Sequence, residues 1–268
     1  MAPGPVASGA QPRKGTGEMN YNWNWPVLWE ISPNGTGTYL GTLWAGLCWT
    51  LATALSAAVI ALLVGTLVGI IRTLPYRWAE RLANGYVELI RNIPLLVQMF
   101  LWFFVMPELL PEKIGIWFKA LPNAPFVTAV ICLGFFHSVR VAVQLSAGIK
   151  SLPAGQQLAA AALGLTLPQA YRYVLLPMAF RLVLPPLTSE CLNIIKNTAV
   201  ALTIGLLELT AAARSMSEFT FQIFEAFAAA TTLYLLVNVV VVLLMRWFER
   251  RVTVPGLIGA AAAGRGGR

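Results

Sequence analysis

Polar side chains recur at helical spacing inside otherwise apolar stretches of this chain. His137, Arg140 and Gln144 follow one another at intervals of three and four residues, which places them on one face of a helix. Charged groups within a hydrophobic stretch are costly to bury and commonly mark the path of a polar solute. A guanidinium holds a carboxylate through two parallel hydrogen bonds, so Arg140 is the candidate contact for an anionic group.

A second set of polar residues repeats this spacing further along the chain. Glu190, Asn193 and Asn197 share one helical face, and Lys196 lies on the neighbouring strip. The candidate solute path therefore consists of six residues: His137, Arg140, Gln144, Glu190, Asn193 and Lys196. In the alternative interpretation these side chains satisfy one another between helices, for example through an ion pair of Arg140 with Glu190.

The composition places these residues in a membrane. Of 268 residues, 57% are hydrophobic and 11% are charged, whereas a soluble domain carries about a quarter charged residues. The stretch from Ala45 to Ile71 contains no Asp, Glu, Lys, Arg or His and exceeds the roughly 20 residues that cross the hydrocarbon core. The sequence predicts an all-α, polytopic membrane protein.

Four further spans are predicted, which gives five in total. They run from about Tyr86 to Met106, Phe126 to Ile149, Pro177 to Leu207, and Ala226 to Trp247. In the second of the five, the clean apolar part starts only after Pro94. The fourth contains Pro185 and Pro186, which predicts a broken or kinked helix.

Basic residues in the short connections predict the orientation. They follow the first, third and fifth spans: Arg72, Arg77, Arg81, Lys150, Arg172, Arg246, Arg250 and Arg251. These ends should be cytoplasmic, so the N-terminus lies outside and the C-terminus inside. The net charge is +8, but the arginines are dispersed at span ends rather than gathered on one face. This pattern favours membrane lipid as the partner and argues against nucleic acid.

The predicted cytoplasmic connection between the third and fourth spans has an unusual composition. Its Ala-rich helix is short of side-chain bulk, and Gly164 permits a sharp turn. Thr166 and Pro168 suit the start of a second short helix, which Pro177 should end. Another protein could grip such a unit. The alternative is an ordinary connecting helix that lies on the membrane surface.

The spacing of this connection resembles the coupling motif of ABC importer permeases, Glu-Ala-Ala, three residues, Gly, nine residues, Ile-x-Leu-Pro. The matching residues are Leu158, Ala159, Ala160, Gly164, Val174, Leu176 and Pro177. Leu158 replaces the glutamate and Val174 the isoleucine. The resemblance implies the type I importer permease fold and a coupling loop at about 153–177 that seats in a separate ATPase subunit.

A longer stretch, from about Asn22 to Pro255, is similar to the glutamate/aspartate importer permeases of Gram-negative bacteria, within the polar amino acid uptake family. The similar passages include residues 91–95, 107–113, 165–173 and 185–190. Many relatives for other amino acids carry Tyr in place of Arg140 and Glu in place of Val143. The resemblance implies an acidic amino acid as substrate, the bacterial inner membrane, a heterodimer with a second permease subunit, and a periplasmic binding protein.

Sequence signatures of an enzyme are missing. The chain has no Gly-x-x-x-x-Gly-Lys-Ser/Thr loop for ATP phosphates and no His-Glu-x-x-His, and its single histidine excludes a multi-histidine metal site. We therefore expect a transport subunit without a cofactor of its own, with ATP bound by its partner. Residues 39–251 form the predicted membrane domain, between tails at 1–38 and 252–268. A permease for another polar amino acid, such as glutamine or a basic amino acid, and a secondary transporter remain alternatives.

Overall fold

The computed structural model describes residues 21–33 and 37–252, so residues 1–20 and 253–268 of the predicted tails lie outside this part. The described residues contain helices and no strand, with one isolated bridge between Ile31 and Thr38. The longer helices are α1 (Tyr39–Ile71), α2 (Arg77–Arg91), α6 (Ala124–Lys150), α9 (Leu176–Asn197), α10 (Leu209–Thr220) and α11 (Ile223–Val252). The shorter ones are η1 (Trp25–Trp29), α3 (Leu95–Phe100), η2 (Leu101–Val105), α4 (Met106–Leu109), α5 (Glu112–Lys119), α7 (Ala154–Ala162), α8 (Leu167–Ala170), η3 (Tyr171–Leu175) and η4 (Thr198–Ile204).

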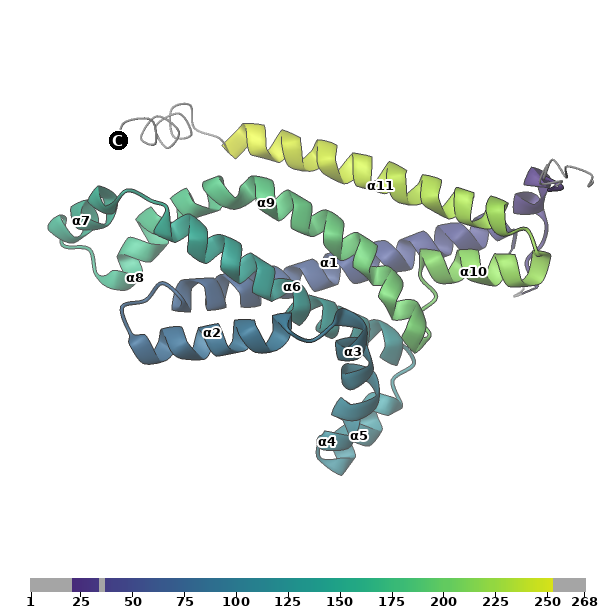
Figure 1. Cartoon of the computed structure of the whole chain (residues 1–268), viewed down its shortest axis with the longest axis horizontal. Helices are drawn as coiled ribbons and strands as arrows, with labels where there is room; N and C mark the ends of the chain where they lie inside the picture. Colours follow the sequence, from purple (N-terminus) through teal and green to yellow (C-terminus); the bar gives the residue numbers. More distant parts are fainter. Residues whose placement is uncertain (1–20, 34–36, 253–268) are drawn as a thin grey trace, which may run out of the picture.

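The predicted number of spans is confirmed, and one of the five is a bent pair of helices. Four helical stretches are long and apolar enough to cross a membrane: Tyr39–Ile71, Ala124–Lys150, Leu167–Ile204 and Ile223–Val252. The fifth candidate is a pair of helices, Arg77–Arg91 and Leu95–Leu109, bent by 97°. Figure 1 shows α3 turning away from α2 almost at a right angle.

The bend means that the predicted second span is not one straight helix. Pro94 cannot donate a backbone hydrogen bond and disfavours helical geometry in the residue before it. The side chain of Gln98 compensates, because its Nε2 donates to the carbonyls of Ile90 at 2.6 Å and Ile93 at 2.9 Å. The break is thus satisfied within the protein, as a membrane environment requires.

The fourth span is a continuous helix where its prolines predicted a break or kink. Helix α9 continues through Pro185 and Pro186, so the predicted break there is wrong, although Figure 1 shows a gentle curve. Pro177 likewise does not end the preceding helix: α8, η3 and α9 follow one another without interruption. The π-helical turn η3 precedes this proline, and its wider hydrogen-bond spacing accommodates the missing N–H.

Helices α1 and α6 approach each other closely along much of their length. A Cβ atom at Gly65 would lie 2.6 Å from the backbone oxygen of Ser138 and 2.6 Å from Cβ of Val141. At Gly134, a Cβ would lie 2.6 Å from the side chain of Ile60. Small residues at such positions let helix backbones approach closely in a membrane. This contact fixes the position of α6, which carries His137 and Arg140.

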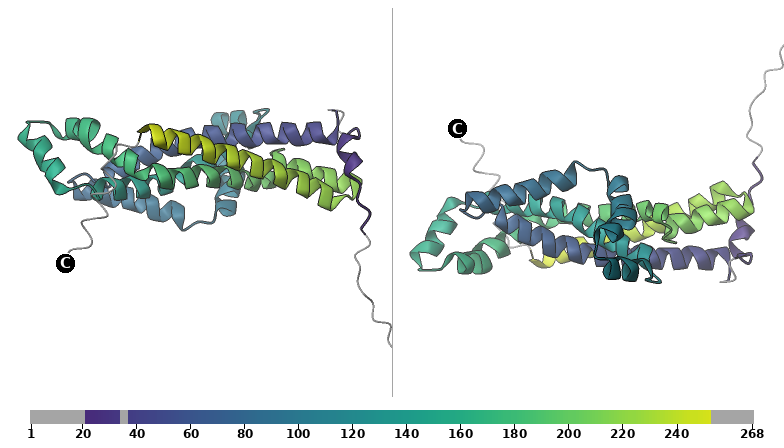
Figure 2. Two further views of the ribbon diagram at one scale, coloured as in Figure 1. Left: turned by 90° about the horizontal axis from the view of Figure 1, so that it is seen from above. Right: turned by 90° about the horizontal axis from the view of Figure 1, so that it is seen from below.

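The molecule is elongated, and its two ends differ in chemistry (Figure 2). The end of α1, the start of α2, the end of α6, helices α7 and α8 and the end of α11 lie towards one end, whereas η1, α10 and the start of α11 lie at the other. The arginines and lysines that predicted a cytoplasmic side therefore do gather at one end of the molecule. Two hydrophobic clusters follow the same division, one among α1, α6 and α9 and one among α1, α10 and α11.

Candidate functional site

Three polar residues of the predicted path meet between α6 and α9. Glu190 is buried, and its Oε1 contacts Nδ1 of the fully buried His137. The guanidinium of Arg140 lies 3.7 Å from the same oxygen. On the other side of the imidazole, Nδ2 of Asn197 lies 3.1 Å from Nε2 of His137. The spacing argument thus identified residues that lie together in three dimensions.

The hydrogen bonds imply how charge is distributed in this cluster. Asn197 presents an amide donor to Nε2 of His137, so that nitrogen accepts and the ring proton lies on Nδ1, directed at Glu190. His137 thus contacts a polar partner through each of its two ring nitrogens. The negative charge of Glu190 is then balanced by the guanidinium of Arg140, while His137 orients the carboxylate.

This cluster holds Arg140 in position but does not use the hydrogen-bond donors of its guanidinium. Its closest approach to Glu190, 3.7 Å, is an ionic contact longer than a hydrogen bond. The side chain is 45% exposed, and its Cζ lies 5.4 Å above the centre of the Phe136 ring. Aromatic stacking and the nearby carboxylate hold the guanidinium in place. Its planar set of donors therefore remains available to an anion.

The remaining path residues surround this group less closely. Gln144 lies one helical turn beyond Arg140, and its buried Oε1 has no hydrogen-bond partner in the described part of the chain. Asn193 is half-buried and Lys196 is exposed on α9. The cluster thus combines an available cation with a buried acceptor that lacks a donor.

The coupling-like residues lie on α7, at the Gly164 turn and on the continuous stretch from η3 into α9, at the arginine-rich end. Helix α7 ends in a Schellman motif: the N–H of Gly164 donates to Ala161 at 3.0 Å, and that of Leu165 donates to Ala160 at 3.1 Å. Gly164 has φ of +76°, a conformation that side-chain-bearing residues rarely adopt. The predicted glycine turn is therefore present at this position.

The second helix begins as its sequence predicted, at Leu167. The side chains of Thr166 and Gln169 form a capping box in which the backbone N–H of Thr166 donates to Gln169 at 2.8 Å. The hydroxyl of Tyr171 donates to the carbonyl of Thr73 at 2.9 Å, which fastens this helix to the end of α1.

One face of this connection is anchored and the other is open. Ala160 is buried, whereas Leu158 and Ala159 are exposed, Leu158 at 70%. Further along, Val174 and Leu176 are half-buried and Pro177 is exposed. Small and apolar side chains thus form a raised surface on a fixed base, which suits a groove in another protein.

Two buried carboxylates at the opposite end were missed from the sequence. Glu208 caps the start of α10 by accepting from the backbone N–H groups of Thr210 at 2.9 Å and Ala211 at 2.8 Å, and it accepts from the Tyr234 hydroxyl at 2.9 Å. An acidic residue directly before the Ala-rich run of α10 was the available signal. The second carboxylate is Glu225, at the start of α11.

Glu225 joins the N-terminal segment to α11. It accepts hydrogen bonds from the hydroxyl of Tyr21 and, at 2.7 Å, from the backbone N–H of Asn24. Burial, with the hydrogen bond to Glu225 and the charge of that residue, raises the pKa of Tyr21. Tyr21 therefore stays protonated and keeps donating at neutral pH. Both acids stabilise the end of the molecule that carries η1 and α10, away from the His137 cluster.

Comparison with known proteins agrees with this geometry. Residues 61–254 match the family described as "binding-protein-dependent transport system inner membrane component". The chain is 49% identical over 244 residues to the glutamate/aspartate import permease protein GltJ of Escherichia coli strain K12, which covers 90% of this chain and 99% of that protein.

Two solved structures share the fold. One, a crystal structure of an amino acid ABC transporter with histidines, aligns with a TM-score of 0.66 at 30% identity and covers 80% of this chain and 95% of that one. An inward-facing MetNI methionine ABC transporter aligns with a TM-score of 0.62 at 17% identity, over 81% and 96% of the two chains. The secondary-transporter alternative finds no support here. With its helices, coupling-like loop and match over residues 61–254, the chain belongs to the family of binding-protein-dependent transport system inner membrane components.

Proposed function

We propose that this chain is the permease subunit that carries glutamate and aspartate through an ATP-driven importer of the bacterial inner membrane. The observation that carries the proposal is Arg140, a cation in the middle of a membrane helix whose hydrogen-bond donors are not used by Glu190. A bidentate guanidinium contact suits the side-chain carboxylate of an acidic amino acid. The identity of 49% to a glutamate/aspartate import permease supports the same substrate.

Gln144 extends the proposed site to the rest of the amino acid. Its buried Oε1 lacks a hydrogen-bond donor in the part of the chain that the structure describes. An ammonium group carries three donors and can fill this need. Gln144 and Arg140 lie one turn apart on α6, so one amino acid can contact both. Asn193 and Lys196 of α9 complete the path, with Lys196 adding positive charge.

The exposed surfaces of this chain indicate which partner proteins it needs. Arg140 is exposed on a single chain, so a second permease subunit is needed to enclose the path, and we propose a heterodimer. A separate ATPase seats the α7 surface around Leu158, Ala159 and Gly164, and binds the ATP. The arginine-rich end faces the cytoplasm together with the C-terminus, while the N-terminus faces the periplasm, where a binding protein delivers the amino acid.

Uptake of radiolabelled glutamate into vesicles that contain the complete transporter and its binding protein tests the substrate assignment. Glutamate and aspartate should compete, whereas glutamine and arginine should not. Arg140→Lys keeps the charge but loses the bidentate geometry, so uptake should fall by at least tenfold, and Arg140→Ala should lose more.

The matched control is Arg140→Lys assayed for assembly and ATP hydrolysis without substrate, both of which should be unchanged. Rescue of Arg140→Ala by Glu190→Gln would mean that the arginine only balances Glu190, against the proposal. Transport of glutamine or a basic amino acid in preference to glutamate would instead favour the alternative substrate classes.

A further inference from the structure

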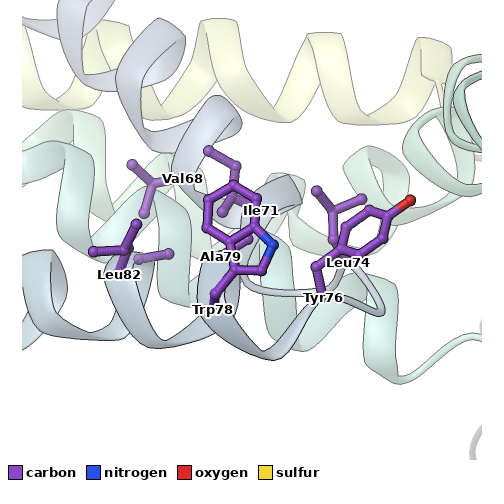
Figure 3. A pocket seen from close by; sticks show the side chains of 8 residues that line it. Val68, Ile71, Leu74, Tyr76, Trp78, Ala79 and Leu82 are labelled. Atoms are coloured by element: carbon purple, nitrogen blue, oxygen red, sulfur yellow. The ribbon is translucent and has the colours of Figure 1, made fainter.

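An apolar groove lies between the end of α1 and the start of α2, at the arginine-rich end of the molecule (Figure 3). Its volume is about 450 Å³. Six aliphatic side chains and the rings of Tyr76 and Trp78 line it. Figure 3 shows Val68 and Ile71 from α1 and Trp78 and Leu82 from α2 around the same space. The groove belongs to neither the solute path nor the α7 surface.

Two large apolar side chains in the walls of this groove are exposed. The side chain of Trp78 is 67% exposed and that of Leu82 is 68% exposed. Beneath them, Ala79 and Ala83 are buried and attach α2 to its neighbours. Large apolar side chains that remain open on a packed helix indicate a surface that another apolar molecule covers.

Two arginines border the groove with their charges uncompensated. Arg77 and Arg81 lie one turn apart on α2, and Arg81 follows Trp78 by three residues and so shares its side of the helix. Neither makes a hydrogen bond or ion pair within residues 21–33 and 37–252. Other charged residues nearby do have partners. Glu80 pairs with Lys150 at 3.9 Å, and Arg72 donates to Asn84 at 2.9 Å and Ser146 at 3.0 Å.

We propose that this groove binds an anionic phospholipid, with an acyl chain between Ile71 and Trp78 and the phosphate against Arg77 and Arg81. A phospholipid brings an apolar chain and a negative group in one molecule, which matches both features of the site. An apolar protein segment would fill the groove but leave the two guanidinium charges without a partner. Tyr76 and Trp78 lie where aromatic rings meet the headgroup layer. The inference holds whichever amino acid is transported.

Native mass spectrometry of the complete transporter, titrated with phosphatidylglycerol or phosphatidylcholine in a neutral detergent, tests this site. One tightly bound phosphatidylglycerol per copy of this chain is expected. Arg77→Gln with Arg81→Gln should weaken phosphatidylglycerol binding by about 30-fold, the loss expected for two basic residues at an anionic lipid surface, and leave phosphatidylcholine binding unchanged. Arg246→Gln with Arg250→Gln removes the same charge at the same end and should change neither.

A second variant separates the acyl chain from the headgroup. Leu82→Trp fills the groove from an exposed position and should weaken both lipids together. Equal phosphatidylglycerol affinity in the Arg77/Arg81 double variant and the parent would overturn the proposal. Cross-linking of a photoreactive phenylalanine analogue at position 78 to another transporter subunit, rather than to lipid, would overturn it as well.

Discussion

Glu190 has two partners with different duties. His137 is fully buried and orients the carboxylate by a hydrogen bond, whereas Arg140 is partly exposed and balances its charge without a hydrogen bond. Within one cluster, His137 thus serves the stability of the fold and Arg140 is left to serve transport. Changes at His137 should affect folding, and changes at Arg140 should affect transport.

The stability role of His137 can be measured directly. His137→Leu removes the hydrogen bond that orients a buried carboxylate, which should lower the free energy of unfolding by about 3 kcal/mol. Replacing both partners, His137→Leu with Glu190→Met, should recover part of that loss, because the buried carboxylate is removed together with its donor, while Asn197 still loses its contact with the imidazole. Thermal unfolding of the purified transporter provides the measurement. A double variant no more stable than the single one would show that Glu190 is not satisfied mainly by His137.

At the level of helices, the sequence predicted which residues share a face but not how the helices are broken. Periodicity correctly placed His137 with Arg140 and Glu190 with Asn197, because helical geometry alone determines such faces. Proline misled the prediction: Pro94 coincides with a bend of 97°, while Pro185 and Pro186 lie inside a continuous helix. The presence of a proline does not decide between the two outcomes, because the bend at Pro94 also involves bonds from the Gln98 side chain to the carbonyls of Ile90 and Ile93.

The turn at Gly164 belongs to the coupling surface. A Cβ at this position would meet no atom within 4 Å, but φ is +76°. Gly164→Asn should therefore be tolerated, since asparagine adopts this conformation more readily than other residues, and Gly164→Ala should cost about 1 kcal/mol. Gly164→Arg adds bulk on the open side as well, so glutamate uptake should collapse and the ATPase should dissociate more readily. Normal uptake and an intact complex in Gly164→Arg would contradict the coupling assignment.

Gly65, at the contact of α1 with α6, can be compared with Gly85, which lies on α2 outside that contact. Gly65→Leu drives a side chain against the backbone of Ser138 and should lower the free energy of unfolding by about 3 kcal/mol. Gly85 on α2 has open space around its missing Cβ, so Gly85→Ala should raise stability by about 0.5 kcal/mol. Denaturation of the purified complex measures both changes in the free energy of unfolding. Similar effects of the two substitutions would show that close helix approach is not what Gly65 provides.

As a whole molecule, the chain is one part of a transporter. The sequence has no phosphate-binding loop, and Arg140 opens to one side of a single chain. Reconstituted alone in vesicles, the chain should neither hydrolyse ATP nor concentrate glutamate under any ion gradient. Adding the ATPase, the second permease and the binding protein should restore both activities. Proton-driven accumulation by the lone chain would contradict its role as a dependent subunit.

The clamp between Tyr21 and Glu225 joins residues 204 positions apart. During synthesis, Tyr21 leaves the ribosome near the beginning and Glu225 close to the end, so the nascent chain carries an unfastened N-terminal segment through most of translation. Only completion of α11 secures it. Resistance of residues 21–24 to a protease with access to both membrane faces should therefore appear late, and chains stalled before residue 225 should stay susceptible, so the clamp marks the maturity of the newly made subunit.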